Sequence, residues 1–276
     1  MKNRKVDNII NGVQTSDGAG VKLRRIIGGP ELNMLDPFLL FDDFGSDNAD
    51  DYIAGFPSHP HRGFETITYM ISGKFRHKDS AGNEGFLSDG SVQWMTAGKG
   101  VIHSEMPEKT NGKVKGFQLW LNLPRSLKMT EPSYNDIPSS DIPIVNLSNG
   151  TLRVIAGSFQ NIKGPGNPHT GMLYFDLTLN PNSNNNIKLE DNWNTFLYVY
   201  EGTAEIGGRQ INNGQMAVLS NKGDLNIRSL NSYLKCVIIS GEPINEPVSR
   251  GGPFVMNTRA EILQAFQDYE EGVLTK

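Results

Sequence analysis

The sequence predicts an all-β protein made of two β-barrels in tandem, with one helix at the C-terminus. Short apolar runs recur between turns rich in Gly, Asn and Asp, which is typical of sandwiches and barrels. The same order of strands and turns begins again in the second half of the chain, which indicates a duplicated unit. Helical periodicity is confined to the end of the sequence.

The first barrel is expected from a series of strand-like runs that ends near residue 123. Turn-forming segments rich in Gly, Asn and Asp separate several of these runs, for example at 79–85 and 97–100. The 30 glycines of the chain exceed the usual share of about 7%, which fits a turn-rich protein. The expected strands are 22–28, 38–44, 65–72, 91–96, 101–106 and 114–123.

A second series follows a connector rich in Pro and Ser at 123–143. Its expected strands are 152–159, 171–179, 195–200, 214–220 and 234–240. The two series align locally as 66–75 on 195–204, with Gly73 on Gly202, and as 89–96 on 213–220. We therefore expect an N-terminal barrel over 1–130, a linker over 131–147 and a C-terminal barrel with the closing helix over 148–276.

The C-terminal helix is predicted from a capping box. Thr258 is followed three residues later by Glu261, and an apolar stripe then follows at helical spacing. The expected stripe is Ile262, Leu263, Phe266 and Tyr269. We expect the helix to close the barrels, with a partner-binding helix as the alternative.

Composition excludes several classes of function. A net charge of −4 with 20% charged residues indicates an ordinary surface, so we expect no nucleic-acid and no membrane partner. Cys236 is the only cysteine, which excludes a disulfide within the chain, and its apolar neighbours predict a buried thiol. No segment approaches the roughly 18 unbroken apolar residues of a membrane span. We expect a cytoplasmic monomer, with a nuclear location and a protein partner left open.

Two short motifs, at 59–65 and 98–105, predict a metal site in the first barrel. Residues two apart on a strand share a face, so His59 pairs with His61, and His103 with Glu105. If the two strands are neighbours with those faces inward, four ligands converge on one point. Three imidazoles and a carboxylate suit iron, manganese, nickel or copper rather than calcium or magnesium.

The remaining candidates are weighed against this set. We expect His77 and His169 to be solvated, because both lie in turn-like sequence. Glu65 shares the parity of His61 if the strand continues, and could be a further ligand, a carboxylate that orients a histidine, or an acid/base group. We favour the orienting role, because Gly63 interrupts the strand pattern.

The second barrel is expected to be metal-free. The alignment puts Lys188 and Glu190 in place of the paired histidines of the first motif, and Asn194 in place of Glu65. The position of His103 falls near Asn226 or Ile227. We expect this barrel to be structural, or to supply a wall or a regulatory surface.

Several long motifs resemble the pirin family of the cupin superfamily, and the resemblance runs from about residue 20 to the last helix. They are HPHRGFETITYMISG, VQWMTAGKGVIHSEMP, GFQLWLNLP and RGGPFVMNTRAEI. The resemblance implies two stacked cupin barrels (double-stranded β-helix, or jelly-roll, barrels) of which only the N-terminal one binds metal. It implies the ligands His59, His61, His103 and Glu105, with iron(II) as the expected single ion and manganese, nickel, copper, cobalt or zinc as alternatives.

The resemblance also implies two classes of function. Bacterial and some other pirins resemble quercetin 2,3-dioxygenases, which open a flavonol ring with dioxygen and release carbon monoxide. Eukaryotic pirin is similar in its site but is described as a redox-dependent transcriptional cofactor. The turn at 79–85 and the short polar N-terminus resemble bacterial members, which favours the enzyme. Glu105 is then the expected proton acceptor, with Glu65 as second candidate. Four aromatic residues lie on or beside the expected strands: Phe64, Trp94, Phe117 and Trp120. We expect most of them to pack in the core, and some are candidates to clamp a planar substrate.

Overall fold

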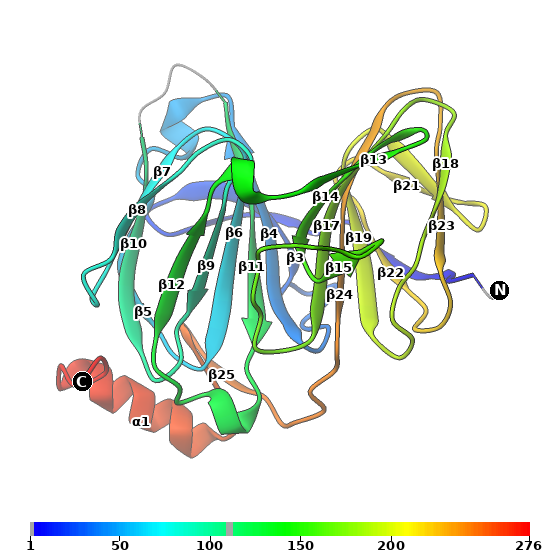
Figure 1. Cartoon of the computed structure of the whole chain (residues 1–276). Helices are drawn as coiled ribbons and strands as arrows, with labels where there is room; N and C mark the ends of the chain where they lie inside the picture. The colour runs from blue at the N-terminus through cyan, green and yellow to red at the C-terminus, as the bar shows by residue number, and fades with distance from the viewer. Residues whose placement is uncertain (1–2, 109–112) are drawn as a thin grey trace. The chain divides into compact units, whose positions relative to one another are not determined.

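The computed structural model describes residues 3–108 and 113–276 (Figure 1). In this part of the chain almost all regular structure is β-strand, and α1 (Arg259–Glu270) is the single α-helix. The chain divides into two compact units. We call them the N-barrel (Val13–Gly28, Phe38–Ser139 and Ile244–Lys276) and the C-barrel (Met1–Gly12, Gly29–Pro37 and Ser140–Pro243).

The N-barrel is made of two antiparallel sheets and a hairpin. Its strands are β2 (Val13–Asp17), β3 (Val21–Ile27), β4 (Phe38–Ser46), β5 (Phe56–His61), β6 (Phe64–Ser72), β7 (Phe75–Asp79), β8 (Glu84–Leu87), β9 (Val92–Thr96), β10 (Val101–Pro107), β11 (Val114–Asn122), β12 (Ser133–Ile137), β25 (Ser249–Gly251) and β26 (Phe254–Met256). One sheet has the order β12-β9-β6-β11-β4-β3-β2 and the other β5-β10-β7-β8, while β25 and β26 pair with each other. Short 3₁₀ turns lie at η1 (Ala49–Asp51) and η2 (Arg125–Leu127).

The C-barrel repeats this plan. Its strands are β1 (Val6–Ile10), β13 (Ile144–Leu147), β14 (Gly150–Ala156), β15 (Ser158–Phe159), β16 (Ile162–Lys163), β17 (Met172–Leu179), β18 (Asn184–Ile187), β19 (Asn194–Glu201), β20 (Thr203–Ile206), β21 (Arg209–Asn212), β22 (Met216–Leu219), β23 (Leu225–Ser229) and β24 (Leu234–Gly241). Its sheets have the orders β1-β22-β19-β24-β17-β14-β13 and β18-β23-β20-β21, with β15 and β16 as a separate pair. The 3₁₀ turn η3 (Ser139–Asp141) comes just before β13.

The two sheet orders match strand for strand, which confirms the predicted duplication. In each barrel the strand that carries the aligned motif, β6 or β19, is the third strand from the same edge of the seven-stranded sheet. The aligned glycines Gly73 and Gly202 follow these strands with φ of +97° and +80°. Only glycine adopts such angles without strain, so the same turn needs the same residue in both copies.

The predicted linker over 131–147 contains strands in the structure. β12 pairs with β9 at an edge of the large sheet of the N-barrel, and β13 pairs with β14 at an edge of the corresponding sheet of the C-barrel. Pro132, Pro138 and Pro143 flank these strands rather than interrupt them. Proline is tolerated beside edge strands, so the Pro-rich composition that indicated a connector is compatible with β-structure.

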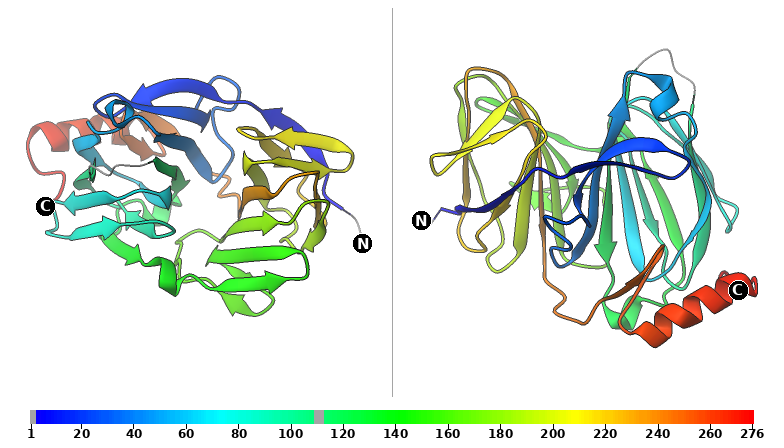
Figure 2. Two further views of the ribbon diagram at one scale, coloured as in Figure 1. Left: turned by 90° about the horizontal axis from the view of Figure 1, so that it is seen from above. Right: turned by 180° about the vertical axis from the view of Figure 1, so that it is seen from behind.

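The C-terminal helix begins at the predicted capping box, with Glu261 donating its backbone N–H to the Thr258 side chain. It lies beside the hairpin β25–β26 of the N-barrel (Figures 1 and 2), whereas the sequence assigned it to the C-terminal barrel. Its buried residues are Ile262 and Ala265, while Leu263 is 60% exposed, so the predicted stripe is only partly correct. The hairpin β25–β26 therefore covers a narrower face of α1 than the spacing of its apolar residues indicated.

The interiors of the two barrels differ. A cluster of buried apolar residues fills the C-barrel, and it includes Cys236, Ile238 and Leu197, so the prediction of a buried thiol is confirmed. Burial raises the pKa of the Cys236 thiol well above its ordinary value. In the N-barrel, polar side chains such as Thr68 and Gln118 line an interior cavity. Among the described residues, no helix has the length and hydropathy needed to cross a membrane.

Candidate metal centre

Two neighbouring strands of the N-barrel carry the predicted ligands. β5 and β10 pair antiparallel, with His103 directly opposite His59. Along β10, His103 and Glu105 are buried, whereas the intervening Ser104 is half-buried. Alternation therefore turns the imidazole of His103 and the carboxylate of Glu105 toward the interior of the barrel.

Three imidazoles converge at this point. His59, His61 and His103 each contribute a ring nitrogen, and these nitrogens all lie within 4.8 Å of one another. The Nε2 atoms of His59 and His61 are 3.0 Å apart. The strand alternation read from the sequence thus corresponds to a real cluster of three nitrogen donors.

Hydrogen bonds fix the tautomers of two of the rings. His59 Nδ1 lies 2.8 Å from the carbonyl oxygen of Pro57, and His61 Nδ1 lies 3.2 Å from that of Pro253. A carbonyl oxygen only accepts, so each Nδ1 carries the hydrogen and each neutral ring presents an unprotonated Nε2. Two lone pairs that face each other at 3.0 Å repel, and a bound cation would remove that repulsion.

The third ring has a nitrogen that needs a ligand. His103 is 1% exposed, and its Nε2 has no hydrogen-bond partner within the described part of the chain. An unsatisfied buried polar atom costs about 1–3 kcal/mol, which coordination to a metal would offset. Three imidazoles are a donor set for first-row transition metals. The cluster therefore fits such a metal ion.

Burial keeps these rings in the neutral form that binds metal. Burial, together with a smaller effect of the neighbouring His59, lowers the pKa of His61 to about 3. Burial also lowers the pKa of His103 well below its ordinary value, with smaller contributions in the same direction from His61, His59 and His77. Near pH 7 the site therefore does not need to lose protons from these two rings before a metal binds.

Glu105 lies beside the three-nitrogen cluster but outside it. The residue is 4% exposed, and its Oε1 accepts a hydrogen bond of 3.0 Å from the Thr68 hydroxyl. Burial raises the pKa of Glu105, against the opposing effects of His59 and Thr68. A buried carboxyl group with a raised pKa is a suitable proton acceptor next to a metal.

Glu65 lies on another face and does not approach the imidazoles. Its carboxylate accepts hydrogen bonds from Thr96 Oγ1 (2.9 Å) and Trp94 Nε1 (3.2 Å). The reason is Gly63, whose φ of +90° turns the chain between β5 and β6, so strand parity cannot be carried from His61 to Glu65. Glu65 and Thr68 are three apart on β6 and face opposite sides. The predicted roles of Glu65 as ligand, orienting group or base therefore have no geometric support.

A cavity of about 690 Å³ opens beside the cluster. His59, His61 and Glu105 line it together with apolar side chains, which include Leu23, Leu40, Phe44, Phe56, Phe75 and Trp120. Its volume lies within the range of roughly 300–1,000 Å³ typical of small-molecule sites. A cavity that combines apolar walls with a few convergent polar groups is the arrangement expected for a small-molecule ligand.

The same cavity has a charged wall away from the histidines. Arg25 forms a bidentate pair with Asp42, at 3.0 Å from Nε to Oδ1 and 2.7 Å from Nη2 to Oδ2. Burial raises the pKa of Asp42 to about 6, although Arg25 acts in the opposite direction. This pair fixes part of the cavity wall and is 17 residues apart in sequence, so the motifs gave no sign of it.

Two of the four predicted aromatic candidates border the metal cluster. The rings of Phe64 and Trp120 lie 5.0 Å and 5.2 Å from the ring of His61, and 4.3 Å from each other. Phe117 packs instead against Phe41. Trp94 donates to Glu65, on the face of β6 that points away from the cluster. Of the four, Trp120 lines the cavity.

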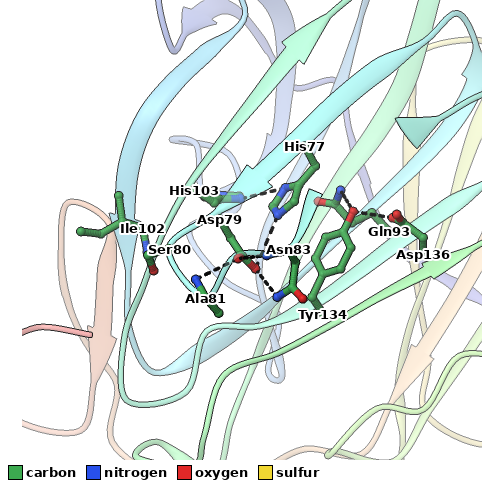
Figure 3. Close-up of polar contacts among 10 residues, drawn as sticks. All are labelled: His77, Asp79, Ser80, Ala81, Asn83, Gln93, Ile102, His103, Tyr134 and Asp136. Atoms are coloured by element: carbon green, nitrogen blue, oxygen red, sulfur yellow. Dashed lines mark hydrogen bonds and ion pairs between the residues drawn. The ribbon is translucent and has the colours of Figure 1, made fainter. Parts of the chain in front are cut away.

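His77 was predicted to be solvated, and this prediction is wrong. It is completely buried, and its Nδ1 lies 3.4 Å from Nδ1 of His103 (Figure 3). The turn-like sequence after His77 suggested a solvated position. His77 nevertheless belongs to β7, where it shares the inward face with Phe75 and Asp79. The alternation of Phe75, His77 and Asp79 was the signal that could have identified it. His169 is exposed, as predicted.

The C-barrel lacks a corresponding cluster among the described residues. Lys188 and Glu190, which align with the paired histidines, are exposed, and Ile227 belongs to the apolar core. At these aligned positions the described residues therefore offer no histidine cluster comparable to that of the N-barrel.

Comparison with known proteins identifies the family of the chain. Residues 20–121 match the family model of Pirin, and residues 174–275 match that of the Pirin C-terminal cupin domain. The chain belongs to the pirin family. The predicted fold class, an all-β chain with two cupin barrels and a C-terminal helix, is thereby confirmed.

Individual relatives align with this pirin over nearly its whole length. A Pseudomonas aeruginosa protein, whose name proposes quercetin 2,3-dioxygenase activity, is 46% identical over 98% of each chain. A pirin-like protein of Caulobacter vibrioides is 44% identical over 98% of each chain. A crystal structure of quercetin 2,3-dioxygenase from Acinetobacter baumannii superposes with a TM-score of 0.92, at 32% identity, and covers 99% of both chains.

Proposed function

We propose that this pirin is a metal-dependent dioxygenase that opens the central ring of a flavonol such as quercetin. The proposed ligands are His59, His61, His103 and Glu105, with iron(II) as the expected ion. The observation that carries the proposal is the convergence of three imidazole nitrogens beside a cavity of about 690 Å³ with largely apolar walls. The names of the Pseudomonas and Acinetobacter relatives support the choice of substrate.

The protein's own residues account for binding and proton transfer. The apolar walls and Trp120 exclude water and accommodate a planar aromatic ring. Glu105 faces the same space and, with its raised pKa, takes up the proton of a substrate hydroxyl. Thr68 orients the carboxylate through Oε1. A transition metal bound by the cluster would supply Lewis-acid chemistry toward that hydroxyl and redox chemistry toward dioxygen.

The test is aerobic turnover of quercetin by metal-replete protein. We expect loss of the flavonol absorbance, uptake of dioxygen and release of carbon monoxide. His61→Ala should lose both metal and turnover, whereas His169→Ala, which removes an exposed histidine of the C-barrel, should match the parent. Glu105→Gln should keep part of the metal and lose turnover by about 10²–10⁴-fold, because a glutamine oxygen can coordinate but cannot take up the proton.

Two results would overturn parts of this proposal. Unchanged turnover in Glu105→Gln would exclude Glu105 as the proton acceptor. If metal-replete parent protein leaves quercetin and related flavonols intact, the dioxygenase proposal fails. A metal-dependent protein that recognises a partner in one oxidation state would then be the better account of the same site.

A further inference from the structure

A buried polar chain continues from His103 through His77 and Asp79, which are not among the residues that line the cavity. His103 Nδ1 faces His77 Nδ1 at 3.4 Å, and His77 Nε2 faces the Asp79 carboxylate at 3.9 Å (Figure 3). His77 and His103 are almost completely buried, and Asp79 is 8% exposed. This chain of groups is therefore shielded from bulk water.

One placement of hydrogens leaves Nε2 of all three clustered rings free for a metal. His59 and His61 donate from Nδ1 to a carbonyl and keep Nε2 free. If His103 follows the same pattern, its Nδ1 must donate to Nδ1 of His77. His77 must then carry its own hydrogen on Nε2, which is the atom that faces the Asp79 carboxylate.

Asp79 is held in place for this role by the following turn. Its Oδ1 accepts from the backbone N–H groups of Ala81 and Asn83, both at 2.9 Å, and its Oδ2 accepts from Asn83 Nδ2 at 2.8 Å. Three donors fix the position of the carboxylate. The orientation of the carboxylate therefore does not depend on His77.

The ring of His77 is held by Tyr134. The two rings lie parallel, with centroids 4.4 Å apart and an interplanar angle of 19°. Tyr134 Oη accepts from Gln93 at 3.0 Å and donates to Asp136 at 2.5 Å. Gly85, the strand partner of His77, makes room for this arrangement, since a Cβ there would lie 1.8 Å from Asp136 Oδ2.

We infer that His77, held by Tyr134 and polarised by Asp79, is a positioning residue that fixes the tautomer and the ring orientation of His103 so that Nε2 is presented to the metal. This inference rests on the proposed metal centre. A histidine ligand whose second nitrogen donates to a defined acceptor is a better-oriented and more basic ligand, and loss of such a partner typically weakens metal binding about 10–100-fold.

Two substitutions separate this role from simple packing. His77→Phe keeps a ring against Tyr134 but removes the acceptor, whereas His77→Asn loses the ring and keeps an acceptor oxygen in the place of Nδ1. The probe is Co²⁺, titrated into metal-free protein against a competing chelator, with the visible spectrum of the bound ion as second readout. His169→Phe is the control for removal of an exposed histidine.

The inference predicts the order of affinities. His77→Phe should bind Co²⁺ about 10–100-fold more weakly than the parent and with an altered spectrum, and His77→Asn should recover most of that loss. A purely structural role predicts the reverse order, with His77→Phe equal to the parent and His77→Asn weakened. That reverse order would overturn the inference.

A measurement on the unmutated metal-free protein tests the same point independently of variants. Long-range ¹H–¹⁵N spectra of histidine-labelled protein should show the hydrogen of His103 on Nδ1 and that of His77 on Nε2. A hydrogen on Nε2 of His103 would overturn the inference. Failure of the parent to take up Co²⁺ would instead refute the metal centre itself, so the two failures are distinguishable.

Discussion

Lys128 provides a quantitative test of how the turn after the metal ligands is held. It is 1% exposed, and its Nζ donates to Gly63 O (2.8 Å), Asn122 Oδ1 (2.8 Å) and Val255 O (3.0 Å). Gly63 belongs to the turn that follows His61, and Val255 belongs to β26. One buried ammonium therefore joins the ligand-bearing turn to the C-terminal hairpin, without a carboxylate partner among these three acceptors.

The pKa of Lys128 sets the sign and size of the effect. Burial lowers it from an ordinary value of 10.5 to about 8, and Glu246 and Glu261 oppose this only in part. Between these two values the unfolded chain keeps the proton and the folded chain releases it, so the free energy of unfolding rises with pH. At about 1.4 kcal/mol per pH unit, Lys128 adds roughly 2–3 kcal/mol of stability between pH 7.5 and 10. This contribution is lost again as the pH falls through 8.

Urea unfolding of the parent and of Lys128→Met at both pH values measures this contribution. The variant should be the less stable protein at pH 7.5, because three buried acceptors lose their donor at about 1–3 kcal/mol each. The difference between parent and variant should then widen by roughly 2–3 kcal/mol at pH 10. Lys235→Met, which removes a partly exposed lysine of the C-barrel, is the control and should show no widening. A constant difference for Lys128→Met would refute the buried, partly desolvated ammonium.

The remaining predictions concern the metal and the two ends of the site. Elemental analysis should find at most about one transition-metal ion per chain, and His103→Ala should empty the site, because fewer donors hold a metal less tightly; two ions per chain would contradict the assignment. The double variant Lys188→Ala/Glu190→Ala should keep metal content and turnover within a few-fold of the parent, because both side chains are exposed. A folded but inactive variant would show that the C-barrel takes part in the chemistry. An ion pair of 2.6 Å between Asp268 and Arg62 joins α1 to the residue that follows His61. Asp268→Ala removes this pair and should weaken metal binding, as measured by competition with a chelator. An affinity equal to that of the parent would show that α1 does not support the site.

Much of the fold could be predicted, because strand alternation and turn glycines are local properties. Gly73 and Gly202 identified equivalent turns in two copies, and the matching sheet orders follow from that duplication. The edge strands could not be predicted. β12 lies in Pro-rich sequence and β1 lies far in sequence from β22, and both are strands only because a barrel edge is available to pair with them.

The metal cluster was accessible for the same local reason, since His59 and His61 are two residues apart on β5 and His103 lies on β10, whose burial alternates. The errors occurred where a turn or a tertiary contact decides orientation. Glu65 follows the turn at Gly63, so its face could not be extrapolated from His61. His77 lies next to a polar turn, and only its contact with His103 shows what it does.

The two barrels differ in how many apolar contacts fill the interior, and the N-barrel has lost such contacts at its site. The C-barrel has the same strand order with an interior filled by apolar side chains, so this topology does not require a metal. In the N-barrel the equivalent space contains the histidines, Glu105 and an open cavity, which removes apolar contacts that would otherwise stabilise the fold. The compensation comes from segments distant in sequence: Pro253 orients His61, Lys128 holds the following turn, and β7 supplies His77 behind His103. The metal-binding strands thus depend on contacts that no local motif encodes, and these contacts are where substitutions should alter metal binding without touching a ligand.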